Sequence, residues 1–145
     1  MLQQTLVEVG TFIAASNDGT GTFLERLDRL AGSVVDYFGA HPDAAQLLLR
    51  DFVNNGPFTS AEGKSVVEMT LGGAVAFLKA GKEAVAFDLD DAERVVIAAT
   101  GYVLLYFGAR TVTDGVLGAE GLSADVLAGH RQHVIGHFRR LCGVS

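Results

Sequence analysis

The stretch DYFGAHPDAAQLLLRDFVNN, residues 36–55, carries the strongest local signals in the chain. It predicts the end of one helix, a turn, and a short helix that begins at His41-Pro42-Asp43. Proline is favoured at a first helical position, because its missing N–H would have no partner there. Asp43 then places a negative charge at the positive end of the helix dipole. The apolar residues that follow, Leu47–Leu49 and Phe52, make the short helix amphipathic.

Helical periodicity extends from this stretch in both directions, and no alternating strand pattern competes with it. We expect one all-α domain over residues 1–145. Its six predicted helices begin near residues 2, 22, 42, 59, 90 and 123. The first ends near residue 15, the fourth at residue 80 and the last near residue 141, and residues 111–122 are predicted to form a glycine-rich loop.

Helix starts are marked by capping signals. Thr22 with Glu25, and Thr59 with Glu62, have the spacing of a capping box, in which the threonine hydroxyl and the glutamate each satisfy a backbone N–H. Asp90 is expected to start the fifth helix and Ser123 to cap the sixth.

Composition limits the classes of partner. Hydrophobic residues make up 49% of the chain and the mean hydropathy is +0.31. The longest apolar run, residues 95–109, is shorter than the ~20 residues of a membrane-spanning helix, so it predicts a buried helix. The N-terminus lacks the basic start and cleavage site of a signal peptide, so we expect a cytoplasmic protein without a membrane partner. The net charge of −6 argues against DNA binding by this chain.

The last two predicted helices carry a pattern typical of a helix–helix interface. Apolar residues and histidines recur there every three or four positions, which is the spacing of a packed seam. Glycines on the fifth helix would let another helix approach closely. This pattern predicts a homodimer in which the two helices of each subunit form a four-helix bundle. The expected interface residues are Ile97, Gly101, Leu104, Gly108, Leu127, His130, Val134, His137 and Leu141.

Three histidines on the last helix leave several interpretations open. His133 and His137, four residues apart, have a spacing that can chelate a metal, but the sequence supplies no further ligand nearby. His130 and His137 fit the rim of the dimer seam, where their protonation would weaken dimerisation below about pH 6. Exposed polar positions are the third possibility. We expect no resident metal.

No catalytic signature is present. The chain has no G-x-S-x-G elbow and no paired carboxylates in an apolar setting, and its one cysteine, Cys142, is best explained as a small core residue. Gly63-Lys64-Ser65 ends like a phosphate-binding loop, but the glycine required five positions earlier is Phe58. We therefore expect neither an enzyme nor a cofactor.

The His41-Pro42-Asp43 helix with its LLLR run resembles the middle of the ligand-binding domain of TetR-family transcriptional regulators. The likeness extends from the first predicted helix to the C-terminus. It implies dimerisation through the last two helices and a small-molecule effector bound in an apolar cavity. Family members read DNA through a basic N-terminal domain, which this chain lacks, since Arg26, Arg29 and Arg50 are the only cations in its first fifty residues. The chain is either a piece of a longer regulator or a free-standing sensor domain.

The inward-facing stripes supply candidate contacts for such an effector, which their apolar and aromatic character predicts to be hydrophobic or aromatic. Each residue could instead simply fill the core. A different class of function, an all-α dimer module that recruits a protein partner without a ligand, also fits the patterns. The candidate ligand-binding residues are Phe12, Leu30, Val34, Phe52, Met69, Thr70, Phe77 and Tyr102.

Overall fold

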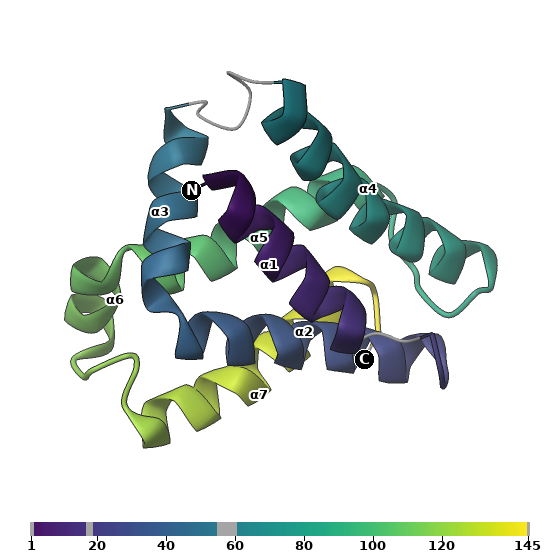
Figure 1. Cartoon of the computed structure of the whole chain (residues 1–145). Coiled ribbons are helices and arrows are strands. Elements are labelled where there is room, and N and C mark those ends of the chain that lie inside the picture. Colours follow the sequence, from purple (N-terminus) through teal and green to yellow (C-terminus); the bar gives the residue numbers. More distant parts are fainter. Residues whose placement is uncertain (1, 17–18, 55–60, 145) are drawn as a thin grey trace.

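The computed structural model describes residues 2–16, 19–54 and 61–144 (Figure 1). Over these residues the chain forms helices joined by short connections, and it contains no strand. The all-α fold class is therefore confirmed. The helices are α1 (Leu2–Ser16), α2 (Phe23–Ala40), α3 (Pro42–Val53), α4 (Ala61–Glu83), α5 (Ala92–Gly108), α6 (Arg110–Leu117) and α7 (Ala124–Leu141).

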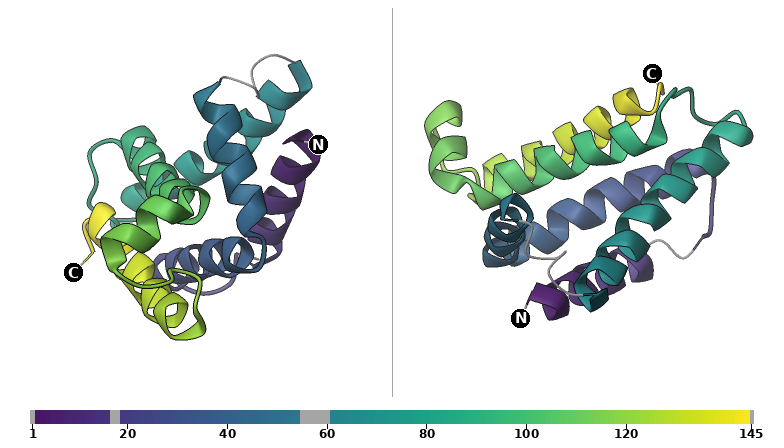
Figure 2. Two further views of the ribbon diagram at one scale, coloured as in Figure 1. Left: turned by 90° about the vertical axis from the view of Figure 1, so that its left-hand side faces the viewer. Right: turned by 90° about the horizontal axis from the view of Figure 1, so that it is seen from above.

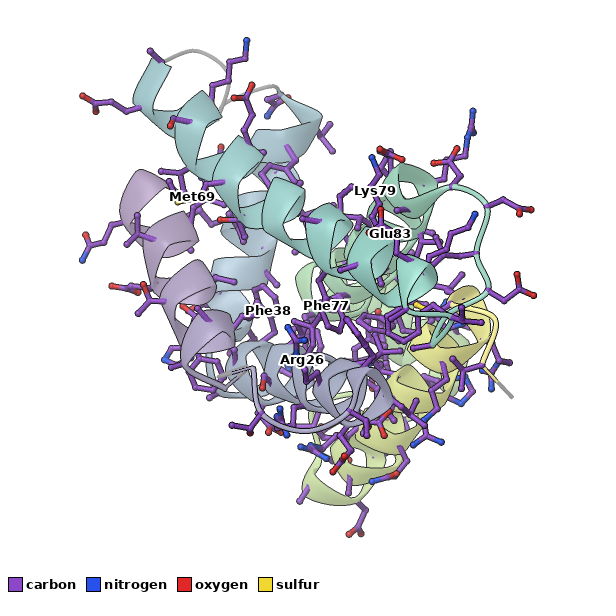
Figure 3. All side chains as sticks on the ribbon, turned by 90° about the vertical axis from the view of Figure 1, so that its right-hand side faces the viewer. Arg26, Phe38, Met69, Phe77, Lys79 and Glu83 are labelled. Atoms are coloured by element: carbon purple, nitrogen blue, oxygen red, sulfur yellow. The ribbon has the colours of Figure 1, made fainter. Side chains whose placement is uncertain are left out.

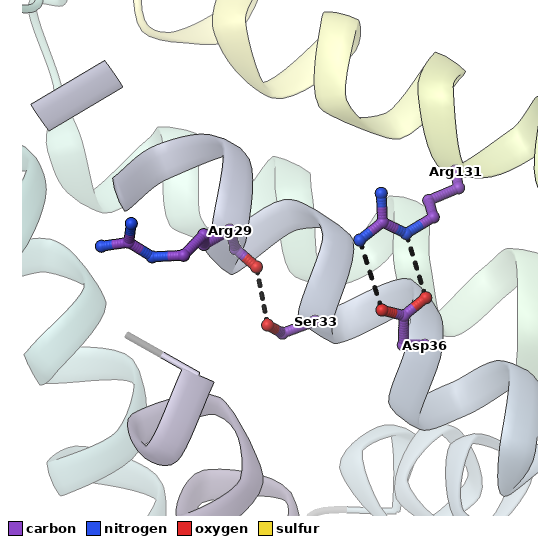
Figure 4. A network of polar contacts seen from close by, with 4 residues as sticks. All are labelled: Arg29, Ser33, Asp36 and Arg131. Atoms are coloured by element: carbon purple, nitrogen blue, oxygen red, sulfur yellow. Dashed lines mark hydrogen bonds and ion pairs between the residues drawn. The ribbon is translucent and has the colours of Figure 1, made fainter. Parts of the chain in front are cut away.

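Helix α7 lies along α2, and this is the most extensive contact between two helices (Figure 2). The Arg131 guanidinium of α7 donates two hydrogen bonds to the Asp36 carboxylate of α2, at 3.0 and 3.3 Å (Figure 4). A second ion pair joins Arg139 to Asp28. Gly32 allows this close approach, because a Cβ atom there would lie 2.4 Å from the Arg131 guanidinium.

Helix α3 crosses α5 at a second close contact. A Cβ atom on Gly108 would lie 3.0 Å from the carbonyl oxygen of Ala45, so the glycine lets the two backbones meet. Helix α1 contacts α2, α3 and α4. Seen from above, α5 and α7 lie on one side of α2, and α1 and α4 lie on the other (Figure 2, right).

The core lies where these helices meet. Phe107 and Val134 are fully buried, and Leu27, Val35 and Cys142 are nearly so. Burial raises the pKa of the Cys142 thiol to about 11, which keeps it protonated at neutral pH. Its backbone carbonyl accepts a hydrogen bond from the Asp88 amide at 2.9 Å. This cysteine therefore packs as a small apolar residue.

The predicted helix starts are partly confirmed. Thr22 and Glu25 form the expected capping box, with bonds of 3.1 and 3.0 Å. Asp91, and not Asp90, caps α5 by accepting from the Arg94 amide at 2.9 Å. Ser123 occupies the cap position of α7, but its side chain makes no capping bond. Thr59, the other predicted cap, lies outside the described residues.

The prediction of six helices is wrong, because the supposed loop at residues 111–122 contains helix α6. Its single interior glycine, Gly115, does not interrupt it, and Gly118 in the left-handed conformation (φ 66°) ends it. The Thr113 hydroxyl donates to the Tyr106 carbonyl at 2.9 Å, which ties α6 to α5. Helix α4 also runs on to Glu83, past the predicted end at Ala80 and Gly81.

Candidate ligand and dimer surfaces

The candidate ligand-binding residues fall into several groups. Leu30, Val34, Phe52, Thr70, Phe77 and Tyr102 are half-buried, which leaves each of them partly accessible from outside the core. Phe12 and Met69 are more open, with exposed fractions of 39% and 75%. Met69 lies on α4, toward the end of that helix away from Phe77 (Figure 3).

Phe77 belongs to an aromatic cluster at the end of α4. Its ring centroid lies 5.8 Å from that of Phe23 and 5.7 Å from that of Phe87. The Arg26 guanidinium carbon lies 4.8 Å from the centre of the Phe77 ring, within range of a cation–π interaction (Figure 3). This cluster joins α2, α4 and the segment after α4.

Phe12 and Thr70 belong to two different helix–helix contacts, that of α1 with α2 and that of α1 with α4. The Phe12 ring packs 5.3 Å from that of Tyr37 on α2. A Cβ atom on Gly10 would lie 3.3 Å from the Thr70 hydroxyl oxygen, so Thr70 marks the contact between α1 and α4. Tyr102 has different neighbours again, because its ring stacks on His137 of α7 at 4.7 Å. Whether any of these residues touches an effector stays a prediction.

The predicted interface residues divide by burial. Leu104, His130 and Val134 are buried inside the subunit, so they offer no exposed area to a second copy. Gly108 packs against α3, and Leu127 lies against Gly39 of α2. His137 and Leu141 are half-buried. Ile97 is 69% exposed, and Gly101 beside it has open space above its Cα atom.

His130 lies in an aromatic pocket formed by α5. Its imidazole stacks on Tyr106 with ring centroids 3.4 Å apart and meets Phe107 edge-on at 5.7 Å. Its Nε2 atom is buried and has no hydrogen-bond partner among the described residues. Burial, with a smaller contribution from His133, lowers the pKa of His130 to about 4. The imidazole is therefore neutral at physiological pH.

The described part of the chain contains no cluster of side chains that could bind a metal ion. His133 is exposed and His137 stacks on Tyr102. Over residues 2–16, 19–54 and 61–144 no three His, Cys, Asp or Glu side chains come together in a way that could hold an ion.

Two of the surface hollows among the described residues bear on the candidate sites. The smaller, about 180 Å³, lies at the junction of α5 and α6 beside Gly108 and Arg110. The larger, about 340 Å³, lies between α1, the end of α2 and the start of α3. None of the candidate ligand-binding residues lines either hollow. Sequence reasoning missed Tyr37, Glu8 and His41 of the larger one, although His41 stands in the turn that marks this corner.

The chain matches the family model described as Tetracyclin repressor-like, C-terminal domain, over residues 24–137. The matched residues cover most of the chain, from α2 to near the end of α7. The protein therefore belongs to the TetR family of regulators, and the predicted resemblance is confirmed. No curated protein and no solved structure matched the chain.

Membrane-spanning potential is weak in the described helices. None of them is long and apolar enough to cross a bilayer alone, and only α5 and α6 taken together, with an 88° bend between them, have the required length and composition.

Proposed function

We propose that the chain is the small-molecule-sensing and dimerisation domain of a cytoplasmic TetR-like transcriptional regulator. The observation that carries this proposal is an exposed apolar surface on α5 and α6 in a chain of this family. Ile97 and Leu105 of α5 are 69% and 54% exposed, and Val112 and Val116 of α6 are 58% and 83% exposed. Exposed large apolar side chains are candidates for interaction sites in soluble proteins where they lie next to one another.

The total accessible surface of the chain is larger than that expected of a monomer of its mass. The chain exposes 8033 Å², whereas a folded monomer of its mass is expected to expose about 7,100 Å². The excess, roughly 900 Å², is close to the ~800 Å² that each partner buries in a stable interface. We infer that a second copy covers α5 through Ile97 and Gly101, with His137 and Leu141 of α7 at the margin.

Effector binding is proposed at the half-buried apolar side chains of α2, α3 and α4. Val34, Phe52 and Phe77 pack against the core while keeping part of their surface accessible, and Leu30 is half-buried beside them in the sequence of α2. A hydrophobic or aromatic molecule that inserts among them would favour the conformation that fits it best. In a dimer, that shift would change the spacing of two DNA-reading heads, which a separate N-terminal domain would supply.

An alternative of another class is an all-α dimer module that recruits a protein partner and binds no effector. The exposed apolar surface favours it equally, because dimer formation alone would cover Ile97 and Leu105. The retention of a small molecule by the purified dimer separates the two proposals.

The dimer can be tested by introducing a charge into the proposed interface. We expect Ile97→Glu to shift a wild-type dimer to monomer in sedimentation equilibrium, because the carboxylate would lose its hydration on association. Val53→Glu is the matched control, since Val53 is 73% exposed at the end of α3 and should leave the dimer intact. A wild-type monomer at every concentration measured, or an Ile97→Glu dimer of unchanged affinity, would contradict this interface.

A further inference from the structure

The connector between α4 and α5, residues 84–91, lies against the C-terminal end of α7. Seen from above, this connector and the C-terminus are side by side, although they are far apart in the sequence (Figure 2, right). The Asp88 amide donates a hydrogen bond of 2.9 Å to the carbonyl of Cys142, the C-cap residue of α7. The bond joins the connector directly to the end of that helix.

The connector is anchored in the core on both sides of Asp88. Phe87 and Leu89 are only 4% and 5% exposed, whereas the Asp88 side chain between them is exposed. Burying two large apolar side chains stabilises this position by several kcal/mol relative to a free loop. The backbone of Asp88 is therefore held at a fixed place beside α7.

Phe87 also belongs to the aromatic cluster at the end of α4. Its ring centroid lies 5.7 Å from that of Phe77 on α4 and 5.9 Å from that of Phe23 on α2. The Phe87 ring packs so closely on Gly81 that a Cβ atom there would overlap with it. Close-packed interiors transmit strain, because few voids absorb a displacement. A movement of the Phe77 ring should therefore displace Phe87.

The last turn of α7 fits tightly against the connector. Gly143 adopts φ 70°, and its amide bonds to the Arg140 carbonyl at 3.1 Å. The Val144 amide bonds to the Arg139 carbonyl at 2.8 Å, which completes a Schellman ending. A Cβ atom on Gly143 would collide with the carbonyl oxygen of Asp88. The connector and this turn therefore meet through backbone atoms, which leaves them little freedom to move separately.

We propose that residues 84–91 act as a strap that couples the aromatic cluster of Phe23, Phe77 and Phe87 to the C-terminal end of α7. Displacement of the Phe77 ring moves Phe87, weakens the bond from Asp88 to α7 and frees the last turn of that helix. The use of the strap by an effector rests on the proposed function, in which Phe77 contacts the effector and α7 borders the dimer interface. The coupling itself is a property of the ligand-free chain, so a failure to bind any effector would leave it standing.

A connector that only adds stability would behave differently. A substitution in the aromatic cluster would then lower the stability of the whole fold, and the end of α7 would respond no more than other helix ends. Coupling through the strap instead predicts an opening confined to the connector and the turn it holds. Exchange rates of single amides distinguish the two cases.

Hydrogen–deuterium exchange, followed by NMR on the full chain without ligand, tests the coupling. In Phe77→Leu we expect the Gly143 and Val144 amides to exchange about five- to tenfold faster than in wild type, after correction for the change in global stability. Phe12→Leu is the matched control, because the Phe12 ring packs on Tyr37 at 5.3 Å and lies outside the aromatic cluster. Equal effects of both variants, or no effect of Phe77→Leu, would overturn the proposal.

A pair of glycine variants tests whether the strap lies on the path. Gly143→Ala blocks the close approach to Asp88, whereas Gly118→Ala, at the end of α6, meets a similar positive φ with nothing within 4 Å. With Gly143→Ala already present, Phe77→Leu should change exchange at Val144 by less than about twofold, because the strap is already open. With Gly118→Ala the full effect should remain. A full effect in both backgrounds would show that the displacement reaches α7 by another route and would refute the strap.

Discussion

At the scale of single residues, two positions are energetically unfavourable: one has a buried polar atom, and the other has a strained backbone. His130 is a base inside an aromatic pocket, and its Nε2 atom has no partner among the described residues. Val85, which follows α4, adopts φ 61°, a conformation that glycine favours and β-branched residues avoid. Both positions should therefore reduce stability in ways that a substitution can reveal.

Acid should destabilise the fold through His130. Its pKa is about 4 in the folded chain and about 6.5 in the unfolded chain. Between these values the unfolded chain binds more protons, so stability falls as the pH drops through that window. From pH 8 to pH 5 the loss should be about 2 kcal/mol.

Urea unfolding at both pH values measures this effect. His130→Phe should lose less stability in acid than wild type, because it removes the titrating nitrogen. The exposed His133, changed to Gln, should keep most of the wild-type pH dependence. If His130→Phe loses as much stability as wild type in acid, the pH dependence arises elsewhere.

Relief of backbone strain at Val85 should stabilise the protein. The Val85 amide bonds to the Lys82 carbonyl at 2.9 Å, and the Ala86 amide bonds to the Gly81 carbonyl at 2.9 Å, which is a Schellman ending. Val85 is 89% exposed, so its replacement loses little packing. Val85→Gly should raise the free energy of unfolding by about 1 kcal/mol. Val85→Ala keeps a Cβ atom and should gain less, and thermal denaturation that ranks alanine above glycine would contradict this account.

At the scale of elements, glycines mark where helices are crowded and where they are free. In α4, a Cβ atom on Gly81 would lie 2.2 Å from the Phe87 ring, which is buried among Phe23 and Phe77. Gly72 in the same helix has nothing within 4 Å. In the sequence, both positions are simply glycines within one predicted helix. Only the structure shows that one is crowded and the other is open.

Alanine substitutions should therefore have opposite effects in α4. Gly81→Ala should lower the free energy of unfolding by about 1–3 kcal/mol, because a rigid ring must move. Gly72→Ala should raise it by about 0.5–1 kcal/mol, because alanine favours the helix. Chemical denaturation of both variants gives the comparison. Shifts of the same sign would show that the crowding around Gly81 does not decide its role.

Helix α6 shows why local patterns predicted some elements and missed others. Thr22 and Glu25 form a capping box, and α3 begins at His41-Pro42-Asp43 with His41 as its N-cap, because both signals act within a few residues. Residues 111–122 contain three glycines and favour a loop on propensity alone. The bond from Thr113 to the Tyr106 carbonyl holds α6 in place, and that contact depends on how the chain folds back on α5.

At the scale of the whole molecule, the fold class was predicted from the sequence more accurately than the positions of the candidate binding surfaces. The apolar spacing on α5 and α7 does not distinguish a side chain that faces the core from one that faces a second subunit. Val134 and Ile97 both fit the predicted seam, but Val134 is fully buried and Ile97 is 69% exposed. The larger hollow was missed because Glu8 and Asp43 come together only when α1 folds across the α2–α3 corner.

The central claim, that this chain is a dimeric small-molecule sensor domain, is tested most directly by native mass spectrometry of the purified protein. One spectrum reports both the number of subunits and any retained ligand. We predict a dimer that releases a bound apolar or aromatic compound when the protein is activated in the gas phase. A monomer without ligand, at concentrations where two chains should associate through the face that contains Ile97, would contradict both parts of the claim.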